Sequence, residues 1–438
     1  MVAFGTESSD AEPRSRRARL VPSARIESGA CGRRPTDLVL AMHILWIKSE
    51  LLHPIDKGGR IRTYNMLRAL KRRHRVTYLT LDNGRASPDA AERSAEYCNE
   101  LIRIPFREAA RGSMRFWFEL AANTVSPLPY AVSKYRSAAM RAAVTRTVNL
   151  HKVDLLVCDF LFPAQNVPPA LSCRTVLFQH NVEAAIWRRH VEVRGNPLSR
   201  AYFREQWRRM VRYERAECRR FDTVVAVSRA DAEELERAYA LRRVKDVPTG
   251  VDTGFFAPGG RAERQPRELV FTGSMDWIPN EDGIVWFVDT VLPRIHASMP
   301  DVSLTVVGRN PPARVKALAE RDSRVRVTGS VPDVRPHLER AALFVVPLRV
   351  GGGTRLKIYE ALAMELPVVS TTIGAEGLPL QPGRHLIVAD GAEDFAAAVL
   401  RLLSDPVEAR DVAASGARFV RENFSWDRVA EVFEELVT

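Results

Sequence analysis

The sequence contains few cysteines and has no long hydrophobic run. Its five cysteines are scattered over 438 residues and none forms a Cys-x-x-Cys pair, which argues against a disulfide scaffold and a zinc site and favours reduced thiols. The missing apolar run argues against a segment that spans a bilayer. What is present is an ordinary globular composition, 46% hydrophobic and 27% charged, with enough residues for two domains that each bury a core.

The first forty residues show no hydrophobic period and lack the apolar core of a secretory signal. They are rich in Arg, Ser, Ala, Pro and Gly, a composition typical of disorder. We therefore expect residues 1–41 to form a disordered extension. Met42 begins an apolar run suited to a first strand, and we interpret it as the true or an alternative start. Reduced thiols and the missing signal favour a cytoplasmic location.

Positive charge is concentrated in the first half of the chain. Residues 41–240 contain 34 basic and 21 acidic residues, whereas residues 241–438 contain 24 and 27. The excess gathers in Lys71–Arg75 and in Arg200–Arg220, where aromatic residues lie among the arginines. Either these stretches are solvated helix faces, or they dock on an anionic membrane surface at the inner face of the plasma membrane. No nucleic acid is expected, because no recognised binding motif accompanies the charge.

From Met42 onward, short apolar runs alternate with helical patterns, and the pattern restarts after a polar connector. Such alternation predicts parallel sheets covered on both faces. We expect an α/β protein with two doubly wound, Rossmann-like domains that face each other across a cleft. The expected parts are residues 42–247, a linker at 248–267, a second domain at 268–422, and a helix at 423–438 that crosses back to the first domain. The predicted strands are His43–Ile47, Val76–Thr80, Asp154–Cys158, Thr175–Phe178, Thr223–Val227, Leu269–Thr272, Ser303–Val307, Arg324–Thr328, Leu343–Val346, Pro367–Ser370 and Leu386–Val388.

Residues 347–360 contain a glycine-rich loop between a predicted strand and a helical pattern. Unpaired backbone N–H groups and the helix dipole favour an anion at such a place. A diphosphate lying between Arg355 and Lys357 would offset both positive charges, and Glu360 would accept hydrogen bonds from neighbouring hydroxyls. The alternative is a plain tight turn with solvated charges. The loop residues of this candidate nucleotide site are Gly351, Gly352, Gly353 and Thr354.

Other predicted strand ends carry similar loops. Gly58 and Gly59 follow the first strand, and His180 follows the strand Thr175–Phe178, where Glu183 could orient it. In the second half, Gly273 follows the first strand, and Glu376 lies in a glycine-containing loop after a later strand. Each loop alone is as easily a turn, and a lone histidine is usually a satisfied polar group. The gathering of the second-half loops at one sheet edge favours a nucleotide pocket there.

Taken in order, these motifs resemble those of a family-4 glycosyltransferase with the GT-B fold. The likeness runs from Met42 to the C-terminus and is greatest to bacterial sugar transferases of exopolysaccharide clusters, which share Gly-Gly-Gly-Thr-Arg-Leu-Lys. The segments that carry it are Gly58-Gly59, His180–Glu183, Val227-Ser228, Pro248–Asp252, Gly273–Asn280, Val307-Gly308 and Gly351–Glu360.

The resemblance implies sugar transfer from a nucleotide diphosphate donor to a glycan or lipid-linked acceptor, with retained anomeric configuration and with neither metal nor cofactor. Arg355 and Lys357 would stabilise the leaving diphosphate, and His180 would contact the donor sugar or position the acceptor. Glu360 matches the second glutamate of the family's Glu-x7-Glu motif and would bind the ribose. The position of the first glutamate holds Gly352.

A second departure concerns the loop after the first strand of the second domain. The family's usual Arg and Lys are missing there, because the loop reads Ser274-Met275-Asp276-Trp277. The expected donor-side residues are Gly273, Gly351, Gly352, Gly353, Thr354, Glu360 and Glu376, and the acceptor-side loop is Gly58-Gly59. Two other functions stay open: a nucleotide-sugar epimerase of the same fold, and a non-catalytic basic binding protein.

Overall fold

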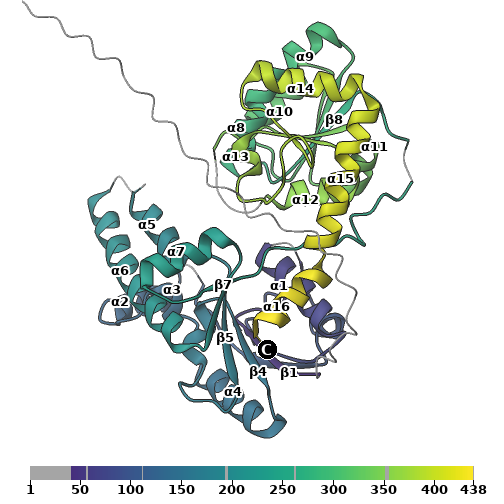
Figure 1. The fold of residues 1–438 in the computed structure, drawn as a ribbon. Coiled ribbons are helices and arrows are strands. Elements are labelled where there is room, and N and C mark those ends of the chain that lie inside the picture. Colours follow the sequence, from purple (N-terminus) through teal and green to yellow (C-terminus); the bar gives the residue numbers. More distant parts are fainter. Residues whose placement is uncertain are drawn as a thin grey trace, which may run out of the picture. The chain divides into compact units, whose positions relative to one another are not determined.

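The computed structural model describes residues 41–55, 58–110, 112–192, 196–260, 263–350 and 355–437 (Figure 1). The predicted disordered extension, apart from Ala41, therefore lies outside the described residues. The same is true of the glycine loop from Gly351 to Thr354.

Within the described residues, seven strands form a first parallel sheet in the order β3-β2-β1-β4-β5-β6-β7. Ile44 of β1 pairs with Val76 of β2 on one side and with Leu155 of β4 on the other. Every residue of β1 is buried, as expected for a parallel sheet covered on both faces. The strands are β1 (His43–Lys48), β2 (Arg75–Asp82), β3 (Glu100–Pro105), β4 (Leu155–Asp159), β5 (Arg174–Gln179), β6 (Thr223–Ala226) and β7 (Lys245–Asp246).

Alternate residues of β1 belong to two separate cores. Leu45 and Ile47 pack with side chains of α4 and α6, whereas Ile44 and Trp46 pack with side chains of α1 and α16. In Figure 1, α1 and α16 accordingly lie side by side, away from α4. The helices of this half are α1 (Gly58–Leu70), α2 (Met114–Asn123), α3 (Tyr130–Ser133), α4 (Ala138–His151), α5 (Glu183–Glu192), α6 (Pro197–Arg220) and α7 (Arg229–Tyr239), with 3-10 turns at Glu92–Glu96 and Phe162–Asn166.

A second sheet repeats this plan. Six strands among the described residues pair in parallel in the order β10-β9-β8-β11-β12-β13, and apolar clusters cover both faces. The strands are β8 (Glu268–Thr272), β9 (Ser303–Val307), β10 (Val325–Gly329), β11 (Leu343–Val346), β12 (Val368–Ser370) and β13 (Ile387–Val388). The helices are α8 (Ile278–Trp286), α9 (Leu292–Ser298), α10 (Ala313–Arg321), α11 (Arg335–Arg340), α12 (Leu356–Ala363), α13 (Thr372–Ala375), α14 (Ala392–Ser404) and α15 (Pro406–Phe424), with a π-turn at Phe287–Val291. The predicted class, two parallel-sheet Rossmann-like α/β domains, is therefore confirmed.

Helix α16 (Trp426–Val437) follows α15 in the chain, yet its apolar face joins the core of the first sheet through Trp426, Val429 and Phe433. The backbone at Gly250 packs closely against the start of α16, because a Cβ on Gly250 would lie 2.8 Å from Trp426 Cδ2. The predicted domain boundaries at 247, 268 and 422 stay predictions. The strands on either side of the predicted linker end at Asp246 and begin at Glu268.

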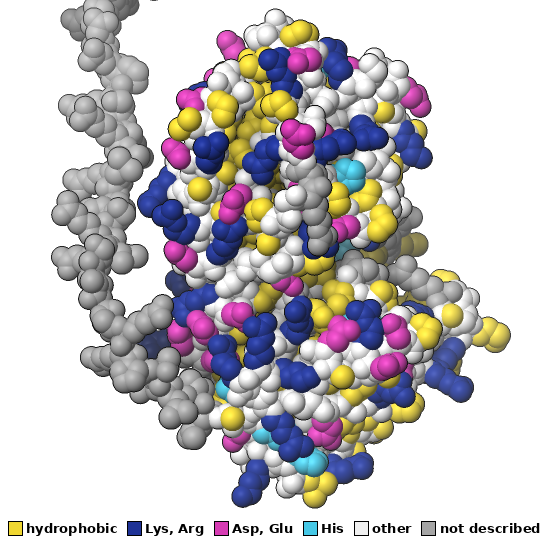
Figure 2. Space-filling model, turned by 90° about the vertical axis from the view of Figure 1, so that its right-hand side faces the viewer, with side chains coloured by type: hydrophobic (Ala, Val, Ile, Leu, Met, Phe, Trp, Pro, Cys, Tyr) yellow, Lys and Arg dark blue, Asp and Glu magenta, His cyan; other side chains and the backbone are white. Residues whose placement is uncertain are grey.

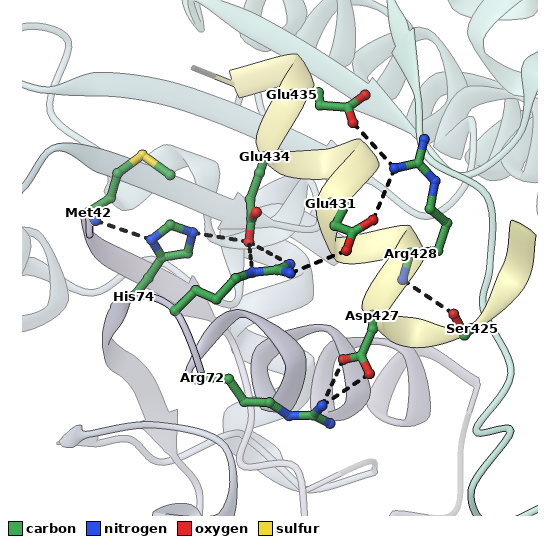
Figure 3. Close-up of polar contacts among 10 residues, drawn as sticks. Met42, Arg72, His74, Ser425, Asp427, Arg428, Glu431, Glu434 and Glu435 are labelled. Atoms are coloured by element: carbon green, nitrogen blue, oxygen red, sulfur yellow. Dashed lines mark hydrogen bonds and ion pairs between the residues drawn. The ribbon is translucent and has the colours of Figure 1, made fainter. Parts of the chain in front are cut away.

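Ion pairs join α16 to the basic stretch Lys71–Arg75 (Figure 3). Arg72 Nη1 lies 3.0 Å from Asp427 Oδ1, and Arg73 Nη2 lies 2.9 Å from Glu434 Oε1. His74 Nε2 lies 3.0 Å from the same Glu434 oxygen. Much of the charge of this basic stretch is thus paired with carboxylates of the same chain, so its place in the chain does not by itself indicate an anionic partner. Basic and acidic side chains are also interspersed on the face drawn in Figure 2.

Within the part of the chain that the structure describes, none of the helices combines the length and the apolar character that a membrane crossing requires.

Candidate active site

A buried carboxylate, Asp159, lies at the centre of a polar cluster in the first half. Trp46 Nε1 donates to Asp159 Oδ2 over 2.9 Å, and Thr63 Oγ1 donates to the same oxygen over 2.5 Å. Lys48 Nζ lies 3.0 Å from Asp159 Oδ1, and these two side chains are 2% and 0% exposed. Lys48 ends β1 and Asp159 ends β4, neighbouring strands at which the strand order reverses. Ligands of doubly wound sheets bind at that edge.

His180, predicted as a site residue, belongs to this cluster. Its Nε2 lies 2.8 Å from Asp159 Oδ1, and its ring stacks on Phe160 with the centroids 4.2 Å apart. Burial first, and then Lys48 and Arg62, lower the pKa of His180 to about 4, although Asp159 opposes the shift. The imidazole is therefore neutral at pH 7. A neutral ring with its hydrogen on Nε2, on the side of Asp159, keeps Nδ1 as a hydrogen-bond acceptor.

The charge of Asp159 is maintained by its neighbours. Burial would raise the pKa of this carboxyl, but Lys48 and His180, together with the hydrogen bond from Thr63, hold the pKa well below its usual range. A fixed negative charge under a neutral imidazole locks both the tautomer and the orientation of His180. Asp159, and not Glu183, therefore orients the ring. The backbone N–H of Glu183 instead donates to Glu214 Oε1 over 2.9 Å at the start of α5.

The predicted loop Gly58-Gly59 lies beside this histidine. Gly58 begins α1, and a Cβ on Gly59 would lie 3.7 Å from His180 Nδ1 and 3.2 Å from Phe160 Cε2. Phe160 itself has a φ of 79°, which is costly for a non-glycine residue, and its N–H donates to Phe178 O over 2.9 Å. The end of β4 is thus bent so that the Phe160 ring faces both the glycine and the imidazole.

In the second half, Lys357 of α12 reaches the end of β8. Its Nζ donates to Asn280 Oδ1 over 2.8 Å and lies 4.0 Å from the centroid of the Phe271 ring. A Cβ on Gly273 would lie 2.7 Å from both Lys357 Nζ and Asn280 Nδ2. A side chain at this position would have to displace the ends of the lysine and asparagine side chains.

Arg355 directly precedes α12, and its side chain is buried. Its guanidinium carbon lies 5.5 Å from the centroid of the Trp277 ring. Burial lowers the pKa of Arg355, and the nearby Glu376 opposes that shift. Glu376 is exposed and caps the C-terminus of the short helix α13. Two donor-side residues predicted from separate loops, Arg355 and Glu376, are thus brought close enough to interact.

Lys357 and Glu360 share one turn of α12 and influence each other. Burial first, and then Arg355, lower the pKa of Lys357 to about 7, while Glu360 opposes the shift. Burial also raises the pKa of Glu360 to about 7, and Lys357 opposes that change. The site therefore holds charges that are poorly solvated without a ligand. An anion beside Lys357 and hydroxyl donors beside Glu360 would each stabilise the charged forms.

Two independent family matches cover most of the chain. The family described as Glycosyltransferase Family 4 matches residues 57–255, which include Gly58, Gly59 and His180. The family described as Glycosyl transferases group 1 matches residues 266–405, which include Gly273, Arg355, Lys357, Glu360 and Glu376. The chain belongs to the family-4 glycosyltransferases.

This glycosyltransferase is 24% identical over 175 residues to a 44.6 kDa protein in the cps region of Klebsiella pneumoniae, a match that covers 38% of this chain and 45% of that protein. It is 26% identical over 229 residues to a GDP-mannose-dependent alpha-(1-6)-phosphatidylinositol monomannoside mannosyltransferase of Mycolicibacterium smegmatis, covering 47% and 59%. The matched segments span about half the length of these curated relatives.

The sucrose-phosphate synthase of Thermosynechococcus elongatus has a similar structure, with a TM-score of 0.64 and 17% identity over 90% of this chain and 98% of that one. At this identity the likeness concerns the fold. It gives this glycosyltransferase the GT-B fold, in agreement with its two parallel sheets.

Several residues of the two sites were not predicted from the sequence. Lys48, Asp159 and Asn280 are among them, as is Arg309, whose Nε donates to Ser274 Oγ over 2.7 Å in the loop that lacks the family's usual cations. A charged residue that ends an apolar strand was the available signal for Lys48 and Asp159. The predicted Gly351, Gly352, Gly353 and Thr354 lie outside the described residues.

Proposed function

We propose that this glycosyltransferase moves a sugar from a nucleotide diphosphate donor to a saccharide or lipid-linked acceptor, with retained anomeric configuration and without a metal ion. The observation that carries the proposal is the cluster of Arg355, Lys357 and Glu360 around the end of β8. It offers two cations to a diphosphate and a carboxylate to ribose hydroxyls at the edge where such sheets bind nucleotides.

On the donor side, Arg355 and Lys357 would bind the phosphate oxygens, because charge-assisted hydrogen bonds to a diphosphate are the strong kind. The backbone amides of Gly351 to Thr354 would donate further hydrogen bonds to the phosphates. Glu360 would accept hydrogen bonds from the ribose. Glu376, which lies near Arg355, would contact the donor sugar and so supply the carboxylate that Gly352 lacks.

The reaction breaks the bond between the anomeric carbon and a phosphate oxygen and forms a bond from an acceptor oxygen to that carbon. Negative charge develops on the leaving diphosphate, and the acceptor's proton passes to the departing phosphate oxygen on the same face of the sugar. Arg355 and Lys357 would stabilise this charge better in the transition state than in the ground state. Both cations are held by protein, so the proposal requires no metal.

His180 would act by hydrogen bonding and not as a base. An imidazole whose pKa is about 4 is a weak proton acceptor, but its Nδ1 can accept a hydrogen bond from a sugar hydroxyl. The Nε2–H bond to Asp159 keeps that lone pair available. This role fits a reaction in which the leaving group itself takes the proton.

The acceptor side of the proposal includes contact with an anionic membrane. On α6, the predicted Arg200–Arg220 stretch exposes arginines at helical spacing, namely Arg204, Arg208, Arg212, Arg215 and Arg219. Arg209 is buried instead and binds the end of α2 through the carbonyl of Asn123. That neighbouring helix exposes Met114 at 91% and Phe118 at 74%. Exposed apolar residues beside arginines favour an interfacial surface.

The relatives suggest which donor substrate to test first. The mycobacterial protein uses GDP-mannose, and the Klebsiella protein lies in a cps region. We therefore propose a nucleotide-sugar donor and a role in exopolysaccharide or other cell-surface glycan synthesis, with GDP-mannose as the first donor to test.

A thermal-shift screen with UDP, GDP and ADP tests the donor site, because a ligand that binds only the folded state raises Tm. One nucleotide should raise the Tm of the wild type, and Glu360→Ala should lose that response. Arg355→Ala should bind the nucleotide but transfer sugar slowly. Glu320→Ala, at an exposed glutamate of α10, is the matched surface control for Glu360→Ala. If no nucleotide raises Tm, the proposal is wrong.

Three further measurements test its remaining parts. Transfer that stops in EDTA would overturn metal independence, and NMR of the product's anomeric proton reports the configuration. Co-sedimentation with anionic liposomes tests membrane contact. Phe118→Ser should weaken it, whereas Val407→Ser, which changes a 63% exposed residue of α15, should not. Absence of wild-type binding at low salt would remove the membrane from the proposal.

A further inference from the structure

Each half places a lysine at the strand reversal of its sheet, but the two lysines have different partners. Lys48 Nζ lies 3.0 Å from Asp159 Oδ1, so a carboxylate balances its charge. Lys357 Nζ donates instead to the amide oxygen of Asn280 over 2.8 Å. Within the described part of the chain Lys357 forms no ion pair, although Glu360 favours its charged form. A neutral group thus fills the place that a carboxylate fills in the first half.

The side-chain amide of Asn280 has a defined orientation. Its Nδ2 donates to Ser274 O over 2.8 Å, which leaves Oδ1 on the side of Lys357. A flipped amide would set its oxygen against the Ser274 carbonyl and its NH2 group against the ammonium, and both contacts would be repulsive. The loop after β8 therefore determines that an oxygen faces Lys357.

The backbone that carries Asn280 is also held in place. Asn280 is 3% exposed, and its N–H donates to Trp277 O over 2.9 Å in the first turn of α8. Three residues later, a Cβ on Gly283 would lie 2.6 Å from Pro347 O, so α8 packs closely on the chain that leaves β11. The oxygen that accepts from Lys357 therefore has a fixed position relative to the ends of β8 and β11.

An amide oxygen directs an ammonium without cancelling its charge. Lys357 has three N–H donors, of which Asn280 accepts one, and its Nζ lies 4.0 Å from the centroid of the Phe271 ring. Both contacts stabilise a cation, yet neither supplies a negative charge. The full charge of Lys357 and its remaining N–H groups are therefore left for an anionic ligand.

We propose that Asn280 is a positioning residue of the donor site, which aims the Lys357 ammonium at the diphosphate and leaves the charge of the lysine uncancelled. The inference rests on the proposed function, because it assumes that Lys357 binds the diphosphate. It gives a physical reason for the asparagine that ends the segment Gly273–Asn280. An aspartate there would form the kind of ion pair that Lys48 forms in the first half, and the diphosphate would compete with that carboxylate.

Calorimetric titration of the purified full chain between pH 6 and 9 tests the inference, with whichever of UDP, GDP and ADP raises Tm most as the probe. Asn280→Leu removes the amide at similar volume, so affinity at pH 7 should fall about tenfold. The pH above which affinity falls should also be lower than in the wild type, because the ammonium has lost an acceptor.

Asn280→Asp should produce the opposite change in the pH profile. Its affinity at pH 7 should also fall about tenfold, because the new carboxylate repels the phosphates. The pH above which affinity falls should nevertheless rise by about one unit, because the carboxylate raises the pKa of Lys357. A loss of local structure would weaken binding at every pH without moving the two profiles in opposite directions.

Two further sets of variants complete the titration. Asn280→Ser, whose shorter side chain withdraws the acceptor, should shift the profile as Asn280→Leu does and serves if that variant folds poorly. Asn423→Leu and Asn423→Asp are the matched controls and should behave like the wild type, because the exposed Asn423 of α15 also donates from its amide to a carbonyl, that of Phe419. Wild-type affinity and pH profile in Asn280→Leu or Asn280→Ser would overturn the inference, as would shifts of the same sign in Asn280→Leu and Asn280→Asp.

A measurement without nucleotide separates this inference from the proposed function. NMR titration of the free protein with ¹³C-labelled lysine gives the pKa of Lys357, and Lys357→Met assigns its signal. That pKa should be about 7 in the wild type, fall in Asn280→Leu and rise in Asn280→Asp. If these shifts occur but no nucleotide raises Tm, Asn280 acts on Lys357 and the donor proposal is wrong. If a nucleotide raises Tm and the pKa is the same in all three proteins, the donor site stands and this inference is wrong.

Discussion

The two halves of this glycosyltransferase share one topology but differ in how they treat charge. At the strand reversal of the first sheet, Asp159 is buried and surrounded by donors from Trp46, Lys48, Thr63 and His180. At the corresponding reversal of the second sheet, burial acts against the charged forms of Lys357 and Glu360. The charges of the first site are balanced by their neighbours, whereas burial opposes those of the second, and we expect a ligand to stabilise the second site.

This difference teaches that the topology of a doubly wound sheet gives the place of a site but not its ligand. A carboxylate whose charge the protein already balances is suited to orienting a neutral ligand group such as a hydroxyl. A buried cation whose charged form is opposed by burial is suited to binding an oxyanion. Substitutions at each site test this difference between the two halves.

The largest effect is expected at the first site. Asp159→Asn leaves Lys48 buried without its counter-charge, which costs about 3–5 kcal/mol of unfolding free energy in comparable cases. It also removes the carboxylate that orients His180, so the rate of sugar transfer should fall as well. Denaturant unfolding measures the first effect. Asp301→Asn, which changes a 61% exposed carboxylate paired with Arg267, should cost about 1 kcal/mol or less. Similar losses in both variants would contradict a pre-formed site.

At the second site, Lys357→Met should lower kcat by about 10²–10³-fold, because one donor to the developing charge is lost. Unfolding free energy should change little or rise, since burial of the amine is unfavourable in the free protein. Steady-state kinetics and denaturant unfolding on one preparation separate the two effects. A variant that loses stability and keeps its kcat would reverse our comparison.

The pH dependence of nucleotide affinity sharpens the contrast further. Lys357 has a pKa of about 7 in the free protein, and a diphosphate favours its charged form, so affinity should fall as pH rises above 7. Glu360, whose pKa burial raises to about 7, should become protonated below that pH and lose acceptor capacity for the ribose. Calorimetric titration should thus show a maximum near pH 7.

Matched variants separate the two limbs of that profile. Lys357→Arg should keep its affinity above pH 7, because a guanidinium stays charged. Glu360→Gln should flatten the limb below pH 7. A wild-type affinity that does not change between pH 6 and 9 would show that neither group titrates on binding.

The smallest effect concerns the helix that ends the chain and packs on the first half. Burial would raise the pKa of Glu434, but His74 and Arg73 outweigh it and lower the pKa (Figure 3). The resulting stabilisation is present above the unfolded-state pKa and is lost as pH falls through the lower folded-state value. Glu434→Gln should cost about 1 kcal/mol at pH 7 and less at low pH. Glu435→Gln, at a 64% exposed carboxylate, is the control.

Hydrophobic runs predicted the core strands of both sheets and the edge strands of the second sheet, but missed both edge strands of the first. The runs at His43–Ile47 and Leu343–Val346 correspond to β1 and β11, which are buried throughout. Strand β3 was missed because it lies at the edge of the first sheet and carries Glu100 and Arg103 among its apolar residues. Strand β7, at the opposite edge, was missed because it consists of two charged, partly buried residues and so has no apolar run.

The site was predicted one residue at a time but not as clusters. His180 was identified from its place at a strand end, yet its partner Asp159 was not, and the nearer Glu183 was chosen instead. Sequence distance is a poor guide here, since Lys48 and Asp159 are 111 residues apart and lie 3.0 Å from each other. Asn280 was quoted within a motif but was not expected to hold Lys357.

The two parallel sheets and the family could be predicted from the amino-acid sequence alone, because buried strands need continuous apolar runs and the motifs lie at the strand ends. Only the tertiary structure decided which side chains meet there and what charge they keep. Burial and neighbouring charges set the pKa values of His180, Lys357 and Glu360, and both depend on residues brought together from distant parts of the chain.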